Sequence, residues 1–143
     1  MKKKALLINI LLTIAIIALV IAAILLMIDR TSAKSFSDIV PNGELFESCQ
    51  IICADGAKVL TDSELDSLMD QLGQLQFYNR GSYDNVMEGN IYSAFFASQQ
   101  TGTVEVHISD TGKIYTHSTC YEFASGVDPR SISSYLEAIF NAE

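Results

Sequence analysis

Glu105, His107 and His117 are the residues whose types could support metal binding or proton transfer. Imidazole nitrogens and carboxylate oxygens are common zinc ligands, and a histidine beside a carboxylate can also relay protons. If residues 103–109 and 113–118 pair as antiparallel strands with residue 109 opposite residue 113, His117 lies opposite Glu105 and His107 opposite Tyr115. This sheet face is a candidate zinc site. The alternative is an ordinary polar face, because no spacing pattern supplies a further ligand or its supporting hydrogen bonds.

Cys49, Cys53 and Cys120 could form a disulfide or act as free thiols. An odd number leaves at least one thiol without an intramolecular partner. On one extended strand the Cα atoms of Cys49 and Cys53 would lie about 13 Å apart, beyond the reach of about 7 Å that a disulfide allows. A bridge from either residue to Cys120 stays open. The alternative is that all three are small buried apolar side chains.

Apolar and aromatic side chains share the second sheet face with the histidines. The same register places Ile91, Phe95 and Tyr115 there. Exposed apolar groups among polar ones often mark contact surfaces, so this face is a candidate protein-binding surface. Burial beneath a loop over residues 79–89 is the alternative.

No nucleophile, metalloprotease or nucleotide-binding motif is present in the sequence. It contains no Gly-x-Ser-x-Gly, Ser-x-x-Lys, HExxH, paired CxxC or P-loop pattern. We therefore expect no catalytic residues, no enzymatic activity and no cofactor other than a possible zinc ion.

Alternating and helical periodicities predict the elements that position these residues. Strands are expected over 45–53, 58–60, 75–78, 91–98, 103–109, 113–118 and 120–124, with an Asp55-Gly56 turn after the first. Thr61 and Glu64 form a capping box before a helix that Gly73 should end in the left-handed conformation. A final helix carries Ile132, Leu136 and Ile139 on one face. The sequence predicts an α+β fold of order β-β-α-β-β-β-β-β-α, mostly antiparallel, with both helices on one face of the sheet.

Two three-residue connections, 100–102 and 110–112, set the expected register of the central strands. Each places a glycine where a bulged type I turn needs a positive φ. Residue 99 should then lie opposite 103, and 109 opposite 113. In this register seven apolar residues of these strands share one face: Tyr92, Ala94, Phe96, Val104, Val106, Ile108 and Ile114.

An uncharged apolar run over residues 5–28 follows three lysines. As a helix it would be roughly 36 Å long, enough to cross a hydrocarbon core of about 30 Å. The lysines favour the cytoplasmic side, which makes residues 1–4 a cytoplasmic tail and places the C-terminal domain outside the membrane. A cleaved signal peptide is the alternative, but the run exceeds the usual apolar length of about 7–15 residues. Residues 29–43 read as a tether and 44–143 as the extracytoplasmic domain.

The charge of the external part is strongly acidic. Five basic residues stand against sixteen acidic ones after residue 30, a net charge of −11. Such a surface repels phosphate backbones, so nucleic acid is not expected as a partner. Asp62, Asp66 and Asp70 follow one side of the first domain helix, which we interpret as a solvated acidic face.

A family resemblance rests on the stretch from strand 45–53 to the following helix. Its matching residues are the turn, cap and core positions Asp55, Gly56, Lys58, Leu60, Thr61, Asp62 and Leu65. In outline this resembles the small extracytoplasmic domains of unknown function on single-pass membrane proteins of Gram-positive bacteria. The resemblance implies a bacterial cell-envelope location and no catalytic residue.

The leading functional hypothesis is therefore a single-pass membrane protein, held in the lipid bilayer by residues 5–28. Its external domain would bind another envelope protein or peptide without catalysing a reaction. The alternative hypothesis is an extracytoplasmic metal-binding protein that uses Glu105, His107 and His117.

Overall fold

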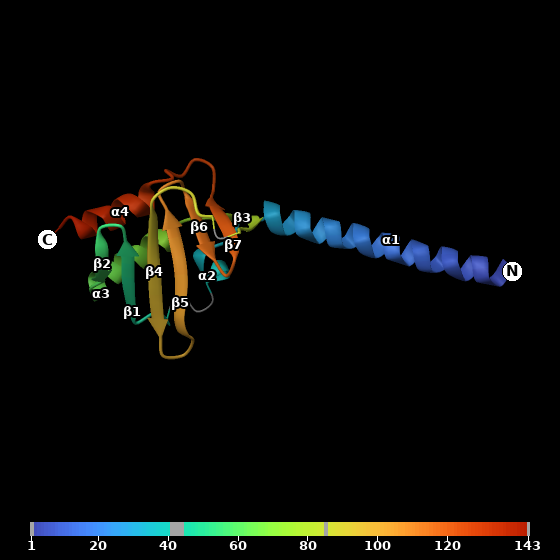
Figure 1. The fold of residues 1–143 in the computed structure, drawn as a ribbon, viewed down its shortest axis with the longest axis horizontal. Coiled ribbons are helices and arrows are strands. Elements are labelled where there is room, and N and C mark those ends of the chain that lie inside the picture. The colour runs from blue at the N-terminus through green and yellow to red at the C-terminus, as the bar shows by residue number, and fades with distance from the viewer. Residues whose placement is uncertain (1, 41–44, 85, 143) are drawn as a thin grey trace. The chain divides into compact units, whose positions relative to one another are not determined.

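The computed structural model describes residues 2–40, 45–84 and 86–142. The chain divides into two compact units, Met1–Ser32 and Ala33–Glu143. The first unit contains helix α1 (Lys2–Thr31), and the second is an α+β domain (Figure 1).

Helix α1 is long and apolar enough over Lys3–Thr31 to cross a membrane. Its leucine, isoleucine and valine side chains are exposed from Leu6 to Ile28. The Thr13 hydroxyl donates to the Asn9 carbonyl at 2.8 Å, so this polar side chain is satisfied within the helix. The predicted span 5–28 lies inside α1, and an apolar helix of this kind is compatible with a membrane anchor.

The α+β prediction is confirmed, and so is the order of its elements. The strands are β1 (Ser48–Cys53), β2 (Gly56–Val59), β3 (Phe77–Ser82), β4 (Ile91–Ser98), β5 (Gly102–Ser109), β6 (Lys113–Thr116) and β7 (Thr119–Phe123). Helix α3 (Asp62–Gly73) separates β2 from β3, and α4 (Ser131–Phe140) follows β7. The strands form one antiparallel sheet in the order β2-β1-β4-β5-β6-β7-β3.

Helices α3 and α4 cover one face of this sheet, which we call the inner face. Their buried apolar residues are Leu65, Leu68, Leu72, Ile132, Leu136 and Ile139. They join a core with inward side chains of the central strands, among them Cys49, Ile51, Ala94, Phe96, Val106 and Ile108. The Tyr135 hydroxyl donates to the Glu64 carbonyl at 3.0 Å, which links α4 to α3.

The register between β5 and β6 is the predicted one, with His107 opposite Tyr115. The register between β4 and β5 differs by two residues, because Ser98 rather than residue 100 lies opposite Gly102. Gly102 therefore opens β5 at a φ of 74° and closes the loop formed by residues 99–101. A shift of two keeps each side chain on its predicted face, since side chains alternate with a period of two.

The structure differs from the tether expected over residues 29–43. A short helix, α2 (Phe36–Ile39), lies in this stretch, and Phe36, Ile39 and Val40 are buried in the domain core. Lys34 and Phe77 exchange two backbone hydrogen bonds of 2.8 and 2.9 Å, which attach the segment to β3. Residues 33–40 therefore belong to the folded domain. The expected boundary at residue 44 lies outside the described residues.

The capping box of α3 is confirmed at its N-terminus. The Thr61 N–H donates to Glu64 Oε2 at 2.8 Å, and the Glu64 N–H donates to Thr61 Oγ1 at 3.3 Å. These bonds hold the pKa of Glu64 below its usual value. The expected left-handed end at Gly73 is wrong. Gly73 is the last residue of the helix and its φ is not positive, and Gln74 follows at a φ of −84°.

Gly73→Ala is therefore expected to raise the free energy of unfolding by about 0.5–1 kcal/mol, because glycine loses more backbone entropy than alanine in a helix. Nothing lies within 4 Å of the position that the new Cβ would take. Urea unfolding of the full chain in detergent measures the change. A loss of about 1 kcal/mol would instead indicate the left-handed conformation.

Candidate functional site

The outer face of the sheet, opposite α3 and α4, has an open half over β2, β1, β4 and β5. Val59 is 62% exposed and Ile52 is 41% exposed on this half. Phe95 and Ile91 lie beside them and are half-buried. Polar side chains stand among them, because exposed Gln50 lies opposite both Val59 and Phe95, and Ser93 lies opposite Ile52. The structure thus places predicted contact residues Ile91 and Phe95 on a mixed apolar and polar surface that no described helix covers.

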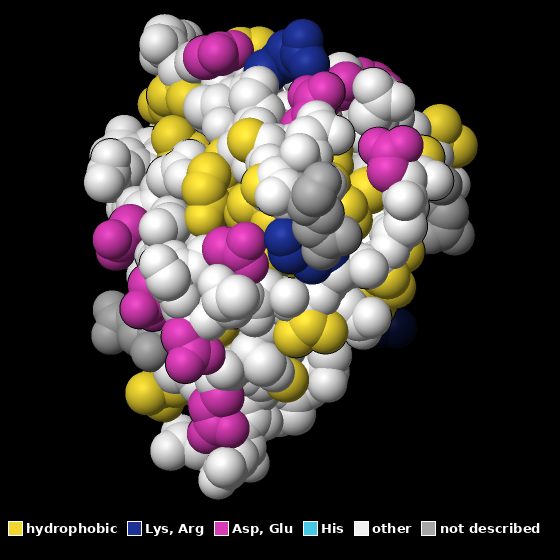
Figure 2. Space-filling model, turned by 90° about the vertical axis from the view of Figure 1, so that its left-hand side faces the viewer, with side chains coloured by type: hydrophobic (Ala, Val, Ile, Leu, Met, Phe, Trp, Pro, Cys, Tyr) yellow, Lys and Arg dark blue, Asp and Glu magenta, His cyan; other side chains and the backbone are white. Residues whose placement is uncertain are grey.

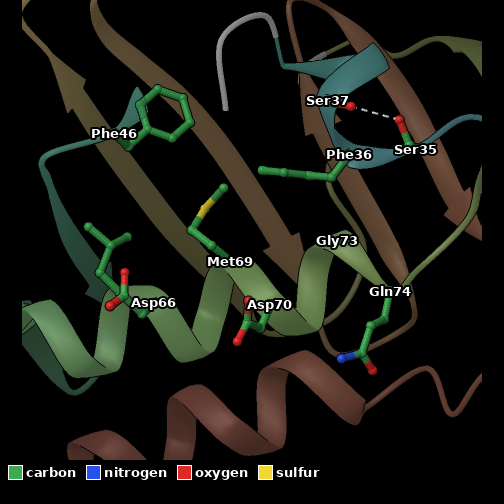
Figure 3. Close-up of a pocket in the computed structure, with 10 residues that line it drawn as sticks. Ser35, Phe36, Ser37, Phe46, Asp66, Met69, Asp70, Gly73 and Gln74 are labelled. Carbon is green, nitrogen blue, oxygen red and sulfur yellow. Dashed lines mark hydrogen bonds between the residues drawn. The ribbon is translucent and has the colours of Figure 1, made fainter. Parts of the chain in front are cut away.

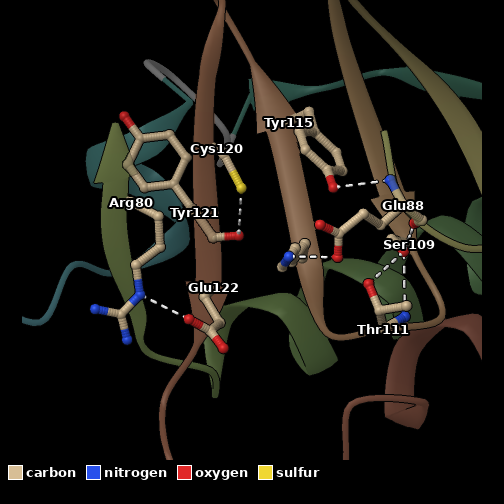
Figure 4. A network of polar contacts seen from close by, with 9 residues as sticks. Arg80, Glu88, Ser109, Thr111, Tyr115, Cys120, Tyr121 and Glu122 are labelled. Atoms are coloured by element: carbon tan, nitrogen blue, oxygen red, sulfur yellow. Dashed lines mark hydrogen bonds and ion pairs between the residues drawn. The ribbon is translucent and has the colours of Figure 1, made fainter. Parts of the chain in front are cut away.

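The other half of the outer face is covered by the stretch between β3 and β4. Tyr115, the third predicted contact residue, is only 2% exposed. The Tyr83 ring packs edge-on against it with centroids 4.8 Å apart. The Glu88 N–H donates to the Tyr115 hydroxyl at 3.1 Å (Figure 4). For Tyr115, the structure therefore agrees with the alternative expectation, burial beneath a loop. Tyr115 is not part of an open contact surface.

An ion pair and hydrogen bonds of Glu88 hold the same covering stretch against the sheet (Figure 4). Lys113 Nζ lies 2.6 Å from Glu88 Oε2, and this bond raises the pKa of Lys113. The Ser109 hydroxyl donates to the Glu88 carbonyl. On the adjoining strands Arg80 Nε lies 2.6 Å from Glu122 Oε2. This network links β3, β5, β6 and β7 and has a structural role.

The structure brings together two of the three predicted zinc ligands. His107 Nε2 lies 3.3 Å from Glu105 Oε1, and its Nδ1 lies 2.9 Å from Ser93 Oγ. His117 is not on β6 opposite Glu105 as predicted. It lies in the two-residue β6–β7 turn at a φ of 49°, exposed to solvent.

A shallow hollow of about 380 Å³ is lined by all three of these side chains. Among the residues that the structure describes, however, no three histidine, cysteine or acidic side chains are grouped closely enough to hold a metal ion. Zinc binding by Glu105, His107 and His117 stays a prediction.

All three cysteines are free thiols. Cys49 is 1% exposed on β1, and burial raises the pKa of its thiol to about 12. Cys53, on the same strand, and Cys120, on β7, are half-buried. Burial also raises the pKa of the Cys120 thiol. The structure thus favours the thiol alternative over a disulfide.

A maleimide at about pH 8 is expected to label Cys53 and Cys120 in the folded chain but to leave Cys49 unlabelled until denaturant is added. The thiolate is the reactive form, and a pKa of about 12 leaves only roughly one Cys49 in ten thousand ionised at that pH. Three variants that each retain one cysteine allow the labelling rate of each thiol to be measured separately by mass spectrometry. Equal rates for the Cys49-only and Cys53-only chains would contradict this order.

A hollow between α2 and α3 has a volume of about 470 Å³. Phe36, Phe46, Leu65 and Met69 provide its apolar walls, and Asp66 and Asp70 stand at its rim. Figure 3 shows Phe36 and Met69 directed toward the same space, with Phe46 above Met69. We call this hollow the α2–α3 pocket.

Sequence reasoning missed the α2–α3 pocket because Phe36 was expected in a tether and the aspartates on a solvated face. One signal was present: Phe36, Ile39 and Val40 follow the spacing i, i+3, i+4 of a helix face. That pattern could have indicated a buried turn of helix.

The domain surface is predominantly acidic. On the face shown in Figure 2, acidic side chains are more widespread than lysine and arginine. The open outer half and the α2–α3 pocket therefore both belong to a negatively charged domain, which favours cationic partners over anionic ones.

No protein-family model, curated protein or solved structure matches the chain.

Proposed function

We propose that this chain is a single-pass membrane protein whose external α+β domain binds another protein or peptide of the cell envelope, without catalysing a reaction. The apolar helix α1 serves as the anchor. Three lysines at positions 2–4 favour a cytoplasmic N-terminus, and the domain of residues 33–143 then lies on the outer side. The net charge of −11 after residue 30 disfavours nucleic acid as the partner.

The observation that carries this proposal is the open half of the outer sheet face. Ile52 and Val59 are exposed there beside the half-buried Phe95 and Ile91. Sheet faces of soluble domains usually present polar residues to water, and exposed apolar side chains among polar ones often mark contact surfaces. The stretch between β3 and β4 covers the other half of this face through Tyr83 and Glu88. The open half is therefore the part of the face that a partner can reach.

Site-specific photocrosslinking in the host cell tests the proposal. A benzophenone amino acid replaces Val59 or Phe95 in the full chain, and the matched control position is exposed Ser125 between β7 and α4. We expect positions 59 and 95 to give the same adduct with a second protein and position 125 to give none. Equal adducts from all three positions, or no protein adduct from 59 and 95, would overturn the proposal.

A further inference from the structure

The α2–α3 pocket has a preformed apolar floor. Phe36 is 2% exposed. The centroid of its ring lies 6.1 Å from that of Phe96 and 6.3 Å from that of Phe77. Phe46 stacks on Phe96 with centroids 4.9 Å apart. These contacts fix the two aromatic walls, while Met69 is the flexible wall that can adjust to a bound group. At about 470 Å³, the space matches the size of pockets that bind small groups.

The rim of the same pocket carries two negatively charged side chains, Asp66 and Asp70. Asp66 and Asp70 lie one turn apart on α3, both exposed. Neither side chain has a hydrogen bond or ion pair with another residue that the structure describes. None of the described residues that line the pocket is basic. Two like charges four residues apart repel each other, so a cation placed between them would be favoured.

We propose that the α2–α3 pocket binds a basic-apolar peptide segment of the partner protein. An apolar or aromatic side chain of that segment packs against Phe36, Phe46 and Met69, and a neighbouring lysine or arginine pairs with Asp66 and Asp70. The combination of an apolar floor and an acidic rim selects such a segment over a neutral or acidic one. This inference rests on the proposed function and specifies the chemistry of its partner.

Methionine methyl NMR of the full chain in detergent provides a direct readout of the pocket. The chain has four methionines, at positions 1, 27, 69 and 87, and Met69 is the one that lines the pocket. The Met69→Leu variant assigns the signal. The probe is the capped tetrapeptide Gly-Phe-Lys-Gly, and its two matched controls carry acetyl-lysine or glutamate in place of lysine.

The lysine peptide is expected to shift the Met69 methyl signal in a saturable manner and to leave the signals of Met27 and Met87 in place. Acetyl-lysine should weaken binding about tenfold, as should the double variant Asp66→Asn with Asp70→Asn, because both remove the charge pairing. The charge-matched control, Asp55→Asn with Asp84→Asn, changes two exposed carboxylates outside the pocket and should bind like the wild type.

Three outcomes would overturn the inference: no Met69 shift with any peptide, equal binding of the lysine, acetyl-lysine and glutamate peptides, or equal weakening in the two double variants. Photocrosslinking from positions 59 and 95 distinguishes this failure from failure of the proposed function. If those adducts persist while the pocket takes no cationic peptide, the domain binds its partner through the open sheet face alone.

Discussion

Phe36→Ala is expected to lower the free energy of unfolding of the α+β domain by about 3–4 kcal/mol. The Phe36 ring is buried between Phe77 and Phe96, so its removal takes aromatic contacts from two strands of the sheet. The site also borders the α2–α3 pocket, so water can enter the space that the ring leaves. The cost should therefore fall in the lower part of the range for buried phenylalanine.

Ser37→Ala is the matched control for Phe36→Ala. Ser37 is exposed on the same short helix, and its Oγ lies 2.9 Å from Ser35 Oγ. A change of no more than about 0.5 kcal/mol is expected there. Urea unfolding of the full chain in detergent, followed by tyrosine fluorescence, measures both variants. Small and equal effects would mean that residues 33–40 behave as the tether that the sequence indicates.

The order of the elements was predictable because the local patterns agree with the final fold. The capping box of Thr61 and Glu64, the helical spacing of Leu65, Leu68 and Leu72, and the alternation along β4 and β5 all favour the observed structure. The β4–β5 register was not predictable to the residue. Two registers that differ by two place the same side chains on the same face, so the apolar pattern cannot separate them.

Other differences arise where the chain departs from the common turn and strand chemistry. His117 and Ser118 both adopt positive φ, at 49° and 63°, and end β6 two residues early. Such turns usually carry asparagine or glycine, so sequence reasoning extended the strand and placed His117 opposite Glu105. Strand β3 continues through Asn79, Arg80 and Ser82, where polar residues at a sheet edge resemble a loop.

The α2–α3 pocket was beyond sequence reasoning for a further reason. Its walls come from α2, from Phe46 and from α3, which the tertiary fold alone brings together. Phe36 and Phe46 lie on opposite sides of a polar stretch and meet only because both rings pack on Phe96. Contacts of this kind depend on the packing of the whole core, whereas periodicity describes one element at a time.

Successive arginines in α1 are expected to abolish its membrane integration in steps. The sixteen leucine, isoleucine and valine residues of the run 5–28 together favour insertion by about 5–10 kcal/mol. One arginine near the centre costs about 2.5–3.5 kcal/mol. The Ile17→Arg chain should therefore remain in the carbonate-resistant membrane fraction. Adding Ile14→Arg and Ile21→Arg raises the cost to about 7.5–10.5 kcal/mol, near or above the gain, so the triple variant should be extracted from the membrane by carbonate.

The triple leucine variant at positions 14, 17 and 21 is the matched control for these arginines, because it alters the same helix face without adding charge. It should remain integrated like the wild type. The number of arginines needed is the informative quantity. A helix held by apolar partitioning stays in the membrane until the cost of inserting the arginines exceeds the favourable free energy of inserting its apolar side chains. Release by Ile17→Arg alone would indicate a much weaker membrane attachment than the run predicts. Retention of the triple arginine chain would show that a part of the protein other than α1 holds it in the membrane.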